Sequence, residues 1–471
     1  MKILLVSPPS ENMITTNIPS MVDEERGISP PLGLLYVAAY VREKTAHSIE
    51  VLDCQAENVG HDSLEERIRR SSPDVVGIQA MTFTWIDVRL AAEAAKRACP
   101  SCKVVLGGPH AHIYPLESLT LPCVDYVIQG EGELPFARLL SALEGACEFS
   151  EVEGLAWRDA ETGKPRRNPP AKPLDDLDSL PFPARDLTPI HKYYSLLAHH
   201  NPITTLFSSR GCPYRCLFCD RPAMGRRFRA HSAPRVVDEL EACQKMGIRE
   251  FFFYDDTFNV NRQRVLDICS EIRRRRLNVT FDIRARVDRM DEEMLKALKG
   301  SGCERIHYGV ESADEETLKI LRKDINLDQV RRIFKATRQN GMKTLAYFMI
   351  GCPGEDRAKA LKTIEFAKKL DPDYLHLSVL TPFPATPLYQ MGLDQGRFKT
   401  DYWAEFARHP EKGFQPPLWE EAMRREELIE LLRYAYKSFY LRPKVVWRNL
   451  SVRSPMEFVR KARAGLKLFR V

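Results

Sequence analysis

Short apolar runs and amphipathic stretches alternate along the first 145 residues. The runs have strand length, and the stretches between them carry apolar residues at helical spacing. Strands are predicted at 3–6, 49–52, 75–78, 104–106 and 126–128, with helices at 34–42, 64–70, 88–98 and from about 135. Such alternation is typical of a doubly wound, Rossmann-like parallel sheet. Ligands of these sheets bind beyond the carboxyl ends of the strands.

The same alternation resumes near residue 201. Strands are predicted at 204–207, 250–254, 279–283, 305–310, 344–350 and 374–379, and helices at 234–246, 261–276, 291–300, 314–321, 327–339 and 357–370. Six βα repeats suit a partial (β/α)6 barrel. As in full barrels, the chemistry is expected at the C-terminal ends of the strands.

Two further segments complete the expected domain plan, which is 1–145, 146–200, 201–400 and 401–471. Residues 146–200 are rich in proline and are predicted to be a linker with a small hairpin near 154–157. Residues 401–471 form a helical, basic C-terminal region, with eleven Lys or Arg and one acidic residue between 431 and 471. That tail is either a membrane-surface element or a helical cap over the barrel with a solvated basic face. The cap is the favoured interpretation.

Composition is that of an ordinary soluble globular protein, and a cytoplasmic location is expected. It has 471 residues, enough for about two to four domains, and a net charge of 70 − 64 = +6. No apolar run reaches the roughly 18 residues of a transmembrane helix, and the N-terminus is too short in apolar residues for a signal peptide. Twelve scattered cysteines without disulfide spacing favour a reducing cytoplasm.

One cysteine motif carries the chemistry. Cys212, Cys216 and Cys219 are spaced CxxxCxxC. Three thiolates can hold three irons of a cubane cluster and leave the fourth iron open, whereas ordinary four-iron ferredoxin sites use four cysteines. The alternative is a zinc knuckle with His231 as fourth ligand, but zinc sites favour paired spacings, and the rest of the chain fits an iron–sulfur site.

This spacing, with Phe218 before the last cysteine, resembles the signature of the radical S-adenosylmethionine (SAM) superfamily. The resemblance implies a [4Fe-4S] cluster whose open iron binds SAM. One electron, supplied by a reductant such as flavodoxin or ferredoxin, then cleaves SAM to a 5′-deoxyadenosyl radical. An exposed cluster of this kind requires a reducing and anaerobic setting.

Several predicted strand ends also resemble SAM-binding elements of that superfamily. Paired carboxylates after the second barrel strand can accept hydrogen bonds from the SAM ammonium. A GxES-like sequence, a basic pair and a GxPGE-like turn resemble the ribose, carboxylate and adenine elements, and glycine lets backbone approach the adenine. The residues so implied are Asp255, Asp256, Arg286, Glu311, Ser312, Arg322, Lys323 and Gly351. Each has a structural alternative as a helix cap or a surface ion pair.

The first domain narrows the resemblance to class B radical SAM proteins, which carry a cobalamin-binding domain. Residues 31–36, 107–110 and 130–133 occur in the order found there. The implied cobalamin residues are Pro8, Thr82, Gly107, Gly108, Gly130 and Glu131. No GxGxxG follows the first strand, so NAD is not expected. A degenerate domain without cobalamin is the alternative.

No cobalt-ligating histidine is expected. A DxHxxG motif is absent after the strands, so the resemblance implies base-off cobalamin. His110 and His112 are interpreted as hydrogen-bonded structural residues. The Cys99 and Cys102 pair is interpreted as incidental, and neither Cys303 nor Cys352 is assigned as a catalytic thiol.

The function that the resemblance implies is methylation of an unactivated carbon. The deoxyadenosyl radical removes hydrogen from that carbon, methylcobalamin supplies the methyl group, and a second SAM remethylates cobalamin. The expected substrate is a small molecule, a lipid or a tetrapyrrole-like compound. Nucleic acid is not expected, since no binding module for it is present. The alternatives are a radical rearrangement or oxidative cyclisation, and a sensor with a dead cluster site. The intact cysteine triad disfavours the sensor.

Overall fold

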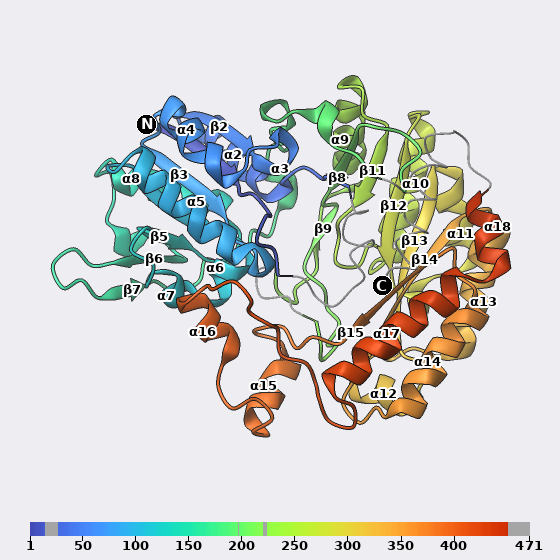
Figure 1. Ribbon diagram of the computed structural model, residues 1–471. Helices are drawn as coiled ribbons and strands as arrows, with labels where there is room; N and C mark the ends of the chain where they lie inside the picture. Colours follow the sequence, from blue (N-terminus) through green and yellow to red (C-terminus); the bar gives the residue numbers. More distant parts are fainter. Residues whose placement is uncertain (15–26, 196, 220–223, 451–471) are drawn as a thin grey trace.

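The computed structural model describes residues 1–14, 27–195, 197–219 and 224–450. Two large sheets form its framework, a mixed sheet in the N-terminal half and a parallel sheet in the C-terminal half, and they lie beside each other in Figure 1. Among these described residues, none of the helices has the length and apolar composition needed to cross a membrane.

The first sheet has the strand order β2-β1-β3-β4-β5-β6-β7. Its strands are β1 (Lys2–Ser7), β2 (Ser48–Asp53), β3 (Val75–Gln79), β4 (Lys103–Gly107), β5 (Tyr126–Ile128), β6 (Leu155–Arg158) and β7 (Pro165–Arg167). Its helices are α2 (Leu32–Lys44), α3 (Cys54–Glu57), α4 (His61–Ser71), α5 (Trp85–Ala98), α6 (Pro109–Ile113), α7 (Pro115–Ser118) and α8 (Glu133–Leu143). Strands β1 to β5 are parallel. The residues of α2 and α8 pack in one apolar cluster and those of α4 and α5 in another, which confirms the doubly wound prediction.

The hairpin of β6 and β7 extends this sheet past residue 145. Strand β6 pairs antiparallel with β5, with Trp157 opposite Tyr126, and β7 pairs antiparallel with β6. The part of the predicted linker from 155 to 167 is therefore an edge of the first sheet, not a free connection.

The second sheet is six-stranded and parallel throughout, in the order β15-β14-β13-β12-β11-β8. Its strands are β8 (Ile203–Leu206), β11 (Glu250–Phe253), β12 (Thr280–Ala285), β13 (Cys303–Glu311), β14 (Lys343–Ile350) and β15 (Tyr374–Val379). The connecting helices are α9 (Ala233–Lys245), α10 (Arg262–Arg274), α11 (Glu292–Gly300), α12 (Glu315–Ile320), α13 (Leu327–Gln339) and α14 (Arg357–Leu370). This arrangement confirms the predicted six βα repeats.

Four helices follow the last strand: α15 (Pro387–Asp394), α16 (Tyr402–Arg408), α17 (Arg425–Tyr440) and α18 (Pro443–Leu450). Helix α17 runs along the edge strand β15 (Figure 1). The Tyr436 hydroxyl bonds the backbone N–H and C=O of Leu377, and Tyr440 does the same for Leu375, at 2.9–3.2 Å. Two tyrosines one helical turn apart thus satisfy backbone groups that an edge strand leaves unpaired. As far as residue 450 the tail is a helical cap. Residues 451–471 lie outside the described residues, and the proposed membrane contact depends largely on them.

Helix α16 packs against the first domain. The indole N–H of Trp85 donates to the backbone carbonyl of Ala407 at 3.1 Å, and the Tyr114 hydroxyl donates to Asp401 at 3.2 Å. Residues of α15 and α16 belong to the same apolar cluster as α4 and α5. The two domains therefore share a packed interior on this side.

A buried ion cluster joins the domains on another side. Arg210 of β9 (Ser209–Arg210) and Arg229 of β10 (Arg229–Ala230) stand opposite each other in a short antiparallel ribbon. Arg210 lies 2.6 Å from Glu133 and 3.2 Å from Glu131, and Arg229 binds Glu131 with both terminal nitrogens. The side chains are between 3% and 11% exposed. Two opposed cations repel across a ribbon, so each arginine depends on the glutamates of the first domain.

This ion cluster brings the carboxyl ends of the two sheets together. Glu131 and Glu133 follow β5, at the carboxyl edge of the first sheet. Arg210 follows β8, at the carboxyl edge of the second sheet, and directly precedes the cysteine loop. Because both edges are where ligands of parallel sheets bind, the cluster sets two candidate sites side by side.

Removing one member of the ion cluster is expected to destabilise the whole chain. Arg210→Met leaves Glu133 buried without its cation, which typically costs about 3–5 kcal/mol. Urea denaturation of the full chain measures the change. The matched control is Arg69→Met, which removes a solvent-exposed arginine from a surface pair on α4 and is expected to change stability little. Equal effects of the two substitutions would contradict the buried cluster's role.

Candidate functional site

The cysteine loop leaves β9 through a glycine that no other residue replaces easily. Gly211 has φ +81°, and a Cβ there would lie 2.3 Å from the carbonyl oxygen of Arg227. Cys212 and Cys216 are buried and Cys219 is half-buried, and all three are free thiols. The thiols therefore sit in a sheltered loop at the carboxyl edge of the second sheet.

Backbone bonds hold this loop against later parts of the chain. The N–H of Leu217 donates to the carbonyl of Leu321 at 2.9 Å, and the N–H of Leu388 donates to the carbonyl of Leu217 at 3.0 Å. Leu321 ends α12 and Leu388 begins α15. The middle of the motif is thus clamped between the barrel and the C-terminal segment.

The zinc alternative finds no support in the described part of the chain. There, no three His, Cys, Asp or Glu side chains converge to hold a single metal ion. A tetrahedral zinc site would bring its thiolates to roughly 3.8 Å from one another, given its Zn–S bonds. His231, the candidate fourth ligand, is buried and bonds Asp178 at 3.1 Å through Nδ1. A cubane attaches each cysteine to its own iron, so it does not require convergence on one point.

Polar groups from the neighbouring strands face the thiols. The Arg286 guanidinium donates to the sulfur of Cys216 at 3.9 Å and stacks on the Tyr214 ring, 3.9 Å from its centroid. Asp288 holds the same guanidinium through two bonds, at 2.9 and 3.2 Å. The Cys212 sulfur lies 3.5 Å from the Thr257 hydroxyl. Arg286 thus places a fixed positive charge beside the Cys216 sulfur. The contacts of Tyr214 and Thr257 could not be predicted from the sequence, since only their positions near the motifs set these residues apart.

Asp255 supports the segment that leads into the cysteine loop. Its carboxylate accepts four bonds, from the N–H and hydroxyl groups of Ser208 and Ser209, at 2.5–3.2 Å. It is fully buried, whereas its neighbour Asp256 is exposed at the strand end. Asp255 therefore positions the residues that lead into the cysteine loop, and the predicted SAM contact of Asp256 stays a prediction.

The two polar residues of the GxES-like sequence, Glu311 and Ser312, have different partners. Glu311, at φ +71°, ion-pairs with Lys323 at 2.9 Å, and both are buried. A Cβ on Gly309 would lie 2.4 Å from the Glu311 carboxylate, so glycine leaves room for this pair. Ser312 instead bonds Thr363 at 3.2 Å and has no exposed surface. Arg322 is exposed. In this structure the Ser312 hydroxyl is engaged by Thr363, and its contact with the ribose stays a prediction.

The GxPGE-like turn is tied by its own glutamate. Glu355 accepts the N–H groups of Gly351 and Cys352 at 2.6 and 3.1 Å. Burial raises the pKa of Glu355 to about 7. A Cβ on Gly351, which has φ +77°, would lie 3.0 Å from Leu428 of α17. The turn is fixed between the strand and the C-terminal cap.

At the carboxyl edge of the first sheet, glycines leave space. A Cβ on Gly107 or Gly130 would meet nothing within 4 Å, whereas one on Gly108 would press on the carbonyl of Ala80. Pro8 is buried, and Thr82 bonds His110 at 3.3 Å. A side chain added at Gly107 or Gly130 would therefore have room at this edge.

Two other residues of this edge are engaged elsewhere. The resemblance implies that Glu131 contacts cobalamin. In the structure its carboxylate forms ion pairs with Arg210 and Arg229. His110 is fully buried against the Trp85 ring, 4.1 Å between centroids, and burial lowers its pKa to about 3. It is therefore a neutral residue packed in the interior of the first domain.

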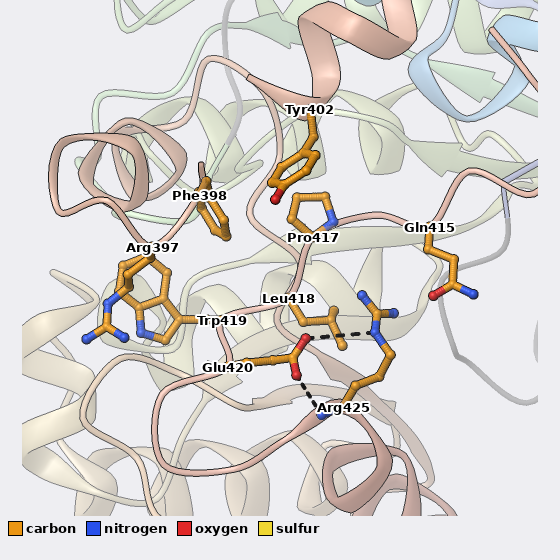
Figure 2. A pocket seen from close by; sticks show the side chains of 9 residues that line it. All are labelled: Arg397, Phe398, Tyr402, Gln415, Pro417, Leu418, Trp419, Glu420 and Arg425. Carbon is orange, nitrogen blue, oxygen red and sulfur yellow. Dashed lines mark hydrogen bonds and ion pairs between the residues drawn. The ribbon is translucent and has the colours of Figure 1, made fainter. Parts of the chain in front are cut away.

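A separate cavity of about 330 Å³ is lined by the segment between α15 and α16, the segment before α17, and the first residues of α16 and α17. Figure 2 shows the nine side chains that line it, with the carboxylate of Glu420 bonded to Arg425. Its second arginine, Arg397, pairs with Glu421. None of the sequence-predicted site residues lines this cavity, so it is not the candidate site.

Comparisons with known proteins agree with this arrangement. A family model for the radical SAM superfamily matches residues 206–367, and one for the B12 binding domain matches residues 20–140. An uncharacterized methyltransferase of Pyrococcus horikoshii is 36% identical over 453 residues, which is 96% of this chain and 95% of that protein. A hopanoid C-3 methylase of Methylococcus capsulatus is 30% identical and covers 76% of this chain and 67% of its own length.

Solved structures share the fold. The radical SAM methyltransferase TsrM of Kitasatospora setae, with cobalamin and a [4Fe-4S] cluster bound, has a TM-score of 0.69 at 20% identity and covers 84% of this chain and 78% of its own. The cobalamin-dependent radical enzyme OxsB has a TM-score of 0.71 at 17% identity and covers 99% and 72%. The predicted cofactor classes, an iron–sulfur cluster with SAM and cobalamin, are confirmed at the level of the family. The chain belongs to the class B radical SAM enzymes, in which a B12 binding domain is fused to a radical SAM core.

Proposed function

We propose that this enzyme transfers a methyl group to an unactivated carbon of a small-molecule or lipid substrate, with cobalamin as the carrier. The observation that carries the proposal is the meeting of two carboxyl edges at the ion cluster of Arg210, Arg229, Glu131 and Glu133. The cysteine loop stands at one edge and the open glycines at the other. When bound, the cluster and SAM supply a carbon-centred radical and cobalamin supplies the methyl group.

The residues of this chain would hold those groups as follows. Cys212, Cys216 and Cys219 bind three irons, and Arg286 stabilises the charge on the Cys216 thiolate. The exposed Asp256 receives the SAM ammonium. The Glu311–Lys323 pair and Arg322 meet the ribose and carboxylate, and the Gly351 turn meets the adenine. Asp255 and Ser312 act by positioning the adjacent backbone.

The first domain would hold cobalamin at Pro8, Thr82, Gly107, Gly108 and Gly130, base-off. The reductant would be a small electron-transfer protein such as flavodoxin or ferredoxin.

A second function has a specific basis. Anaerobic magnesium-protoporphyrin IX monomethyl ester cyclases of Rubrivivax gelatinosus and Cereibacter sphaeroides are each 27% identical, over 89% and 91% of this chain. In an oxidative cyclisation the cobalamin is not a methyl donor.

Isotope transfer separates the two functions. The reconstituted enzyme is incubated with SAM that carries a trideuterated methyl group. Cobalamin is then recovered, and its mass is measured by mass spectrometry. Methyl transfer predicts that the label reaches cobalamin under reducing conditions. A cofactor that stays unlabelled while SAM is cleaved to 5′-deoxyadenosine would favour cyclisation and contradict the methylation proposal.

Loss of one cluster cysteine is expected to abolish the radical chemistry. Cys216→Ala removes a ligand of the cluster, so iron and sulfide content and 5′-deoxyadenosine formation should fall to background. Cys147→Ala, a half-buried thiol of the first domain outside the motif, is the control and should retain both. A Cys216→Ala protein that still cleaves SAM would disprove the assignment. A Cys216→Ala protein that loses SAM cleavage but still responds to cobalamin or metal binding would indicate a sensor.

Filling the glycine-lined edge is expected to exclude cobalamin. A Cβ added to Gly107 would have no neighbour within 4 Å, so Gly107→Val should fold normally while its side chain occupies the ligand's space. Cobalamin retained after desalting is expected to fall at least about tenfold, equivalent to about 1.4 kcal/mol. Gly300→Val, in helix α11 of the second domain, is the control and should retain cobalamin. Undiminished cobalamin retention in Gly107→Val would place the ligand elsewhere.

A further inference from the structure

One face of the second sheet is not covered by packed side chains. Along β15, Leu375 and Leu377 are buried against the helices, whereas His376 and Ser378 are half-buried. Along β11, Phe251 and Phe253 are buried and Phe252 is half-buried. Parallel sheets that are covered on both faces bury both sets of side chains. The inner face of the barrel therefore retains accessible surface.

Side chains from neighbouring strands form a connected aromatic and polar layer on this inner face. The rings of Phe252 and His307 lie 4.9 Å apart between centroids, and those of Tyr347 and His376 lie 5.2 Å apart. The His307 Nδ1 lies 3.1 Å from the Tyr347 hydroxyl. Strands β11, β13, β14 and β15 all contribute to this layer.

Arg284 of β12 adds a positive charge to this aromatic and polar layer. Its guanidinium lies 5.0 Å from the Phe252 ring centroid and 4.9 Å from that of Tyr254. Within the described residues no carboxylate forms an ion pair with Arg284. Asp282, two positions deeper on the same strand, is paired with Arg305. The charge of Arg284 therefore lies against aromatic faces, with no carboxylate partner among the described residues.

The proton positions make Tyr347 a second donor. The Arg305 Nε–H donates to His307 Nε2 at 3.3 Å, so the neutral ring carries its proton on Nδ1 and donates it to the Tyr347 oxygen. Burial and the nearby Arg305, Arg284 and His376 lower the pKa of His307, which keeps the ring neutral. The Tyr347 oxygen is thus an acceptor toward His307, and its own O–H is available as a donor.

We propose that the inner face of the barrel binds an anionic group of the substrate, a carboxylate or a phosphate-type group, through Arg284 and Tyr347. A guanidinium and a hydroxyl are well suited to the oxygens of such an anion. The inference rests on the proposed function, since it treats the barrel interior as the substrate site. Arg284 is two residues deeper than Arg286, or about 7 Å along the strand, and Arg286 contacts Cys216. An anion at Arg284 would leave the rest of the substrate extending toward the cysteine loop.

Simple anions test the site without turnover. The full-length, anaerobically reconstituted protein is titrated with methylphosphonate, acetate and neutral acetamide, and binding is measured by ligand-observed NMR. At least one anion is expected to bind about tenfold or more tightly than acetamide. Preference for methylphosphonate would assign a phosphate-type group, and preference for acetate a carboxylate.

Three variants identify the residues responsible. Arg284→Met is expected to weaken anion binding at least about tenfold, and Tyr347→Phe about threefold. Arg332→Met, an exposed arginine of α13, is the charge-matched control and should bind as the parent does. Anion binding that survives Arg284→Met would overturn the proposal.

The affinity for SAM is measured in parallel for the parent and for Arg284→Met. This measurement distinguishes a substrate-binding role of Arg284 from a SAM-binding role. A loss of SAM affinity in Arg284→Met equal to its loss of anion affinity would assign the arginine to SAM and overturn the substrate site. Because probe binding requires no SAM cleavage, a protein that binds the anions but transfers no methyl group would count against the proposed function alone.

Discussion

The structure depends on one electrostatic constraint, the pairing of two opposed arginines with two glutamates from the other domain. Arg210 and Arg229 face each other across the ribbon at the base of the cysteine loop. Buried cations in that position require compensating charge, and Glu131 and Glu133 provide it. The conformation of the cysteine loop is thereby coupled to the carboxyl edge of the first sheet. A radical enzyme that uses two cofactors needs their sites to be held in register, and this contact can do so.

Several residues that resemble cofactor ligands hold other residues in place. Asp255 binds the two serines before the cysteine loop, and Ser312 bonds Thr363. Glu131 belongs to the ion cluster. Residues of one motif can therefore differ in role: Asp255 is buried and fixes the backbone, whereas its neighbour Asp256 is exposed at the strand end. This division of roles follows from hydrogen-bond satisfaction, since a buried carboxylate with four donors has little capacity left for a ligand.

The elements of both sheets were predictable because their apolar runs and helical periodicities are strong. The three cysteines stand out by their spacing, and their role as cluster ligands stays a prediction. The hairpin of β6 and β7 was expected only in part, since β7 is exposed at every position and contains Pro165, so it lacks a buried-strand pattern. The partner of Glu131 lies 98 residues away in Arg229, and periodicity carries no information about such long-range pairs. The anion-binding layer likewise depends on strand register, which brings Arg284 beside His307.

The most direct test of the account is the cofactor content of one reconstituted sample. The purified protein is treated anaerobically with iron, sulfide and hydroxocobalamin, desalted, and assayed for all three. The account predicts about four irons together with about one tightly bound, base-off cobalamin per chain. An intact iron–sulfur cluster without retained cobalamin would contradict it, because the first domain would then not be a cofactor site.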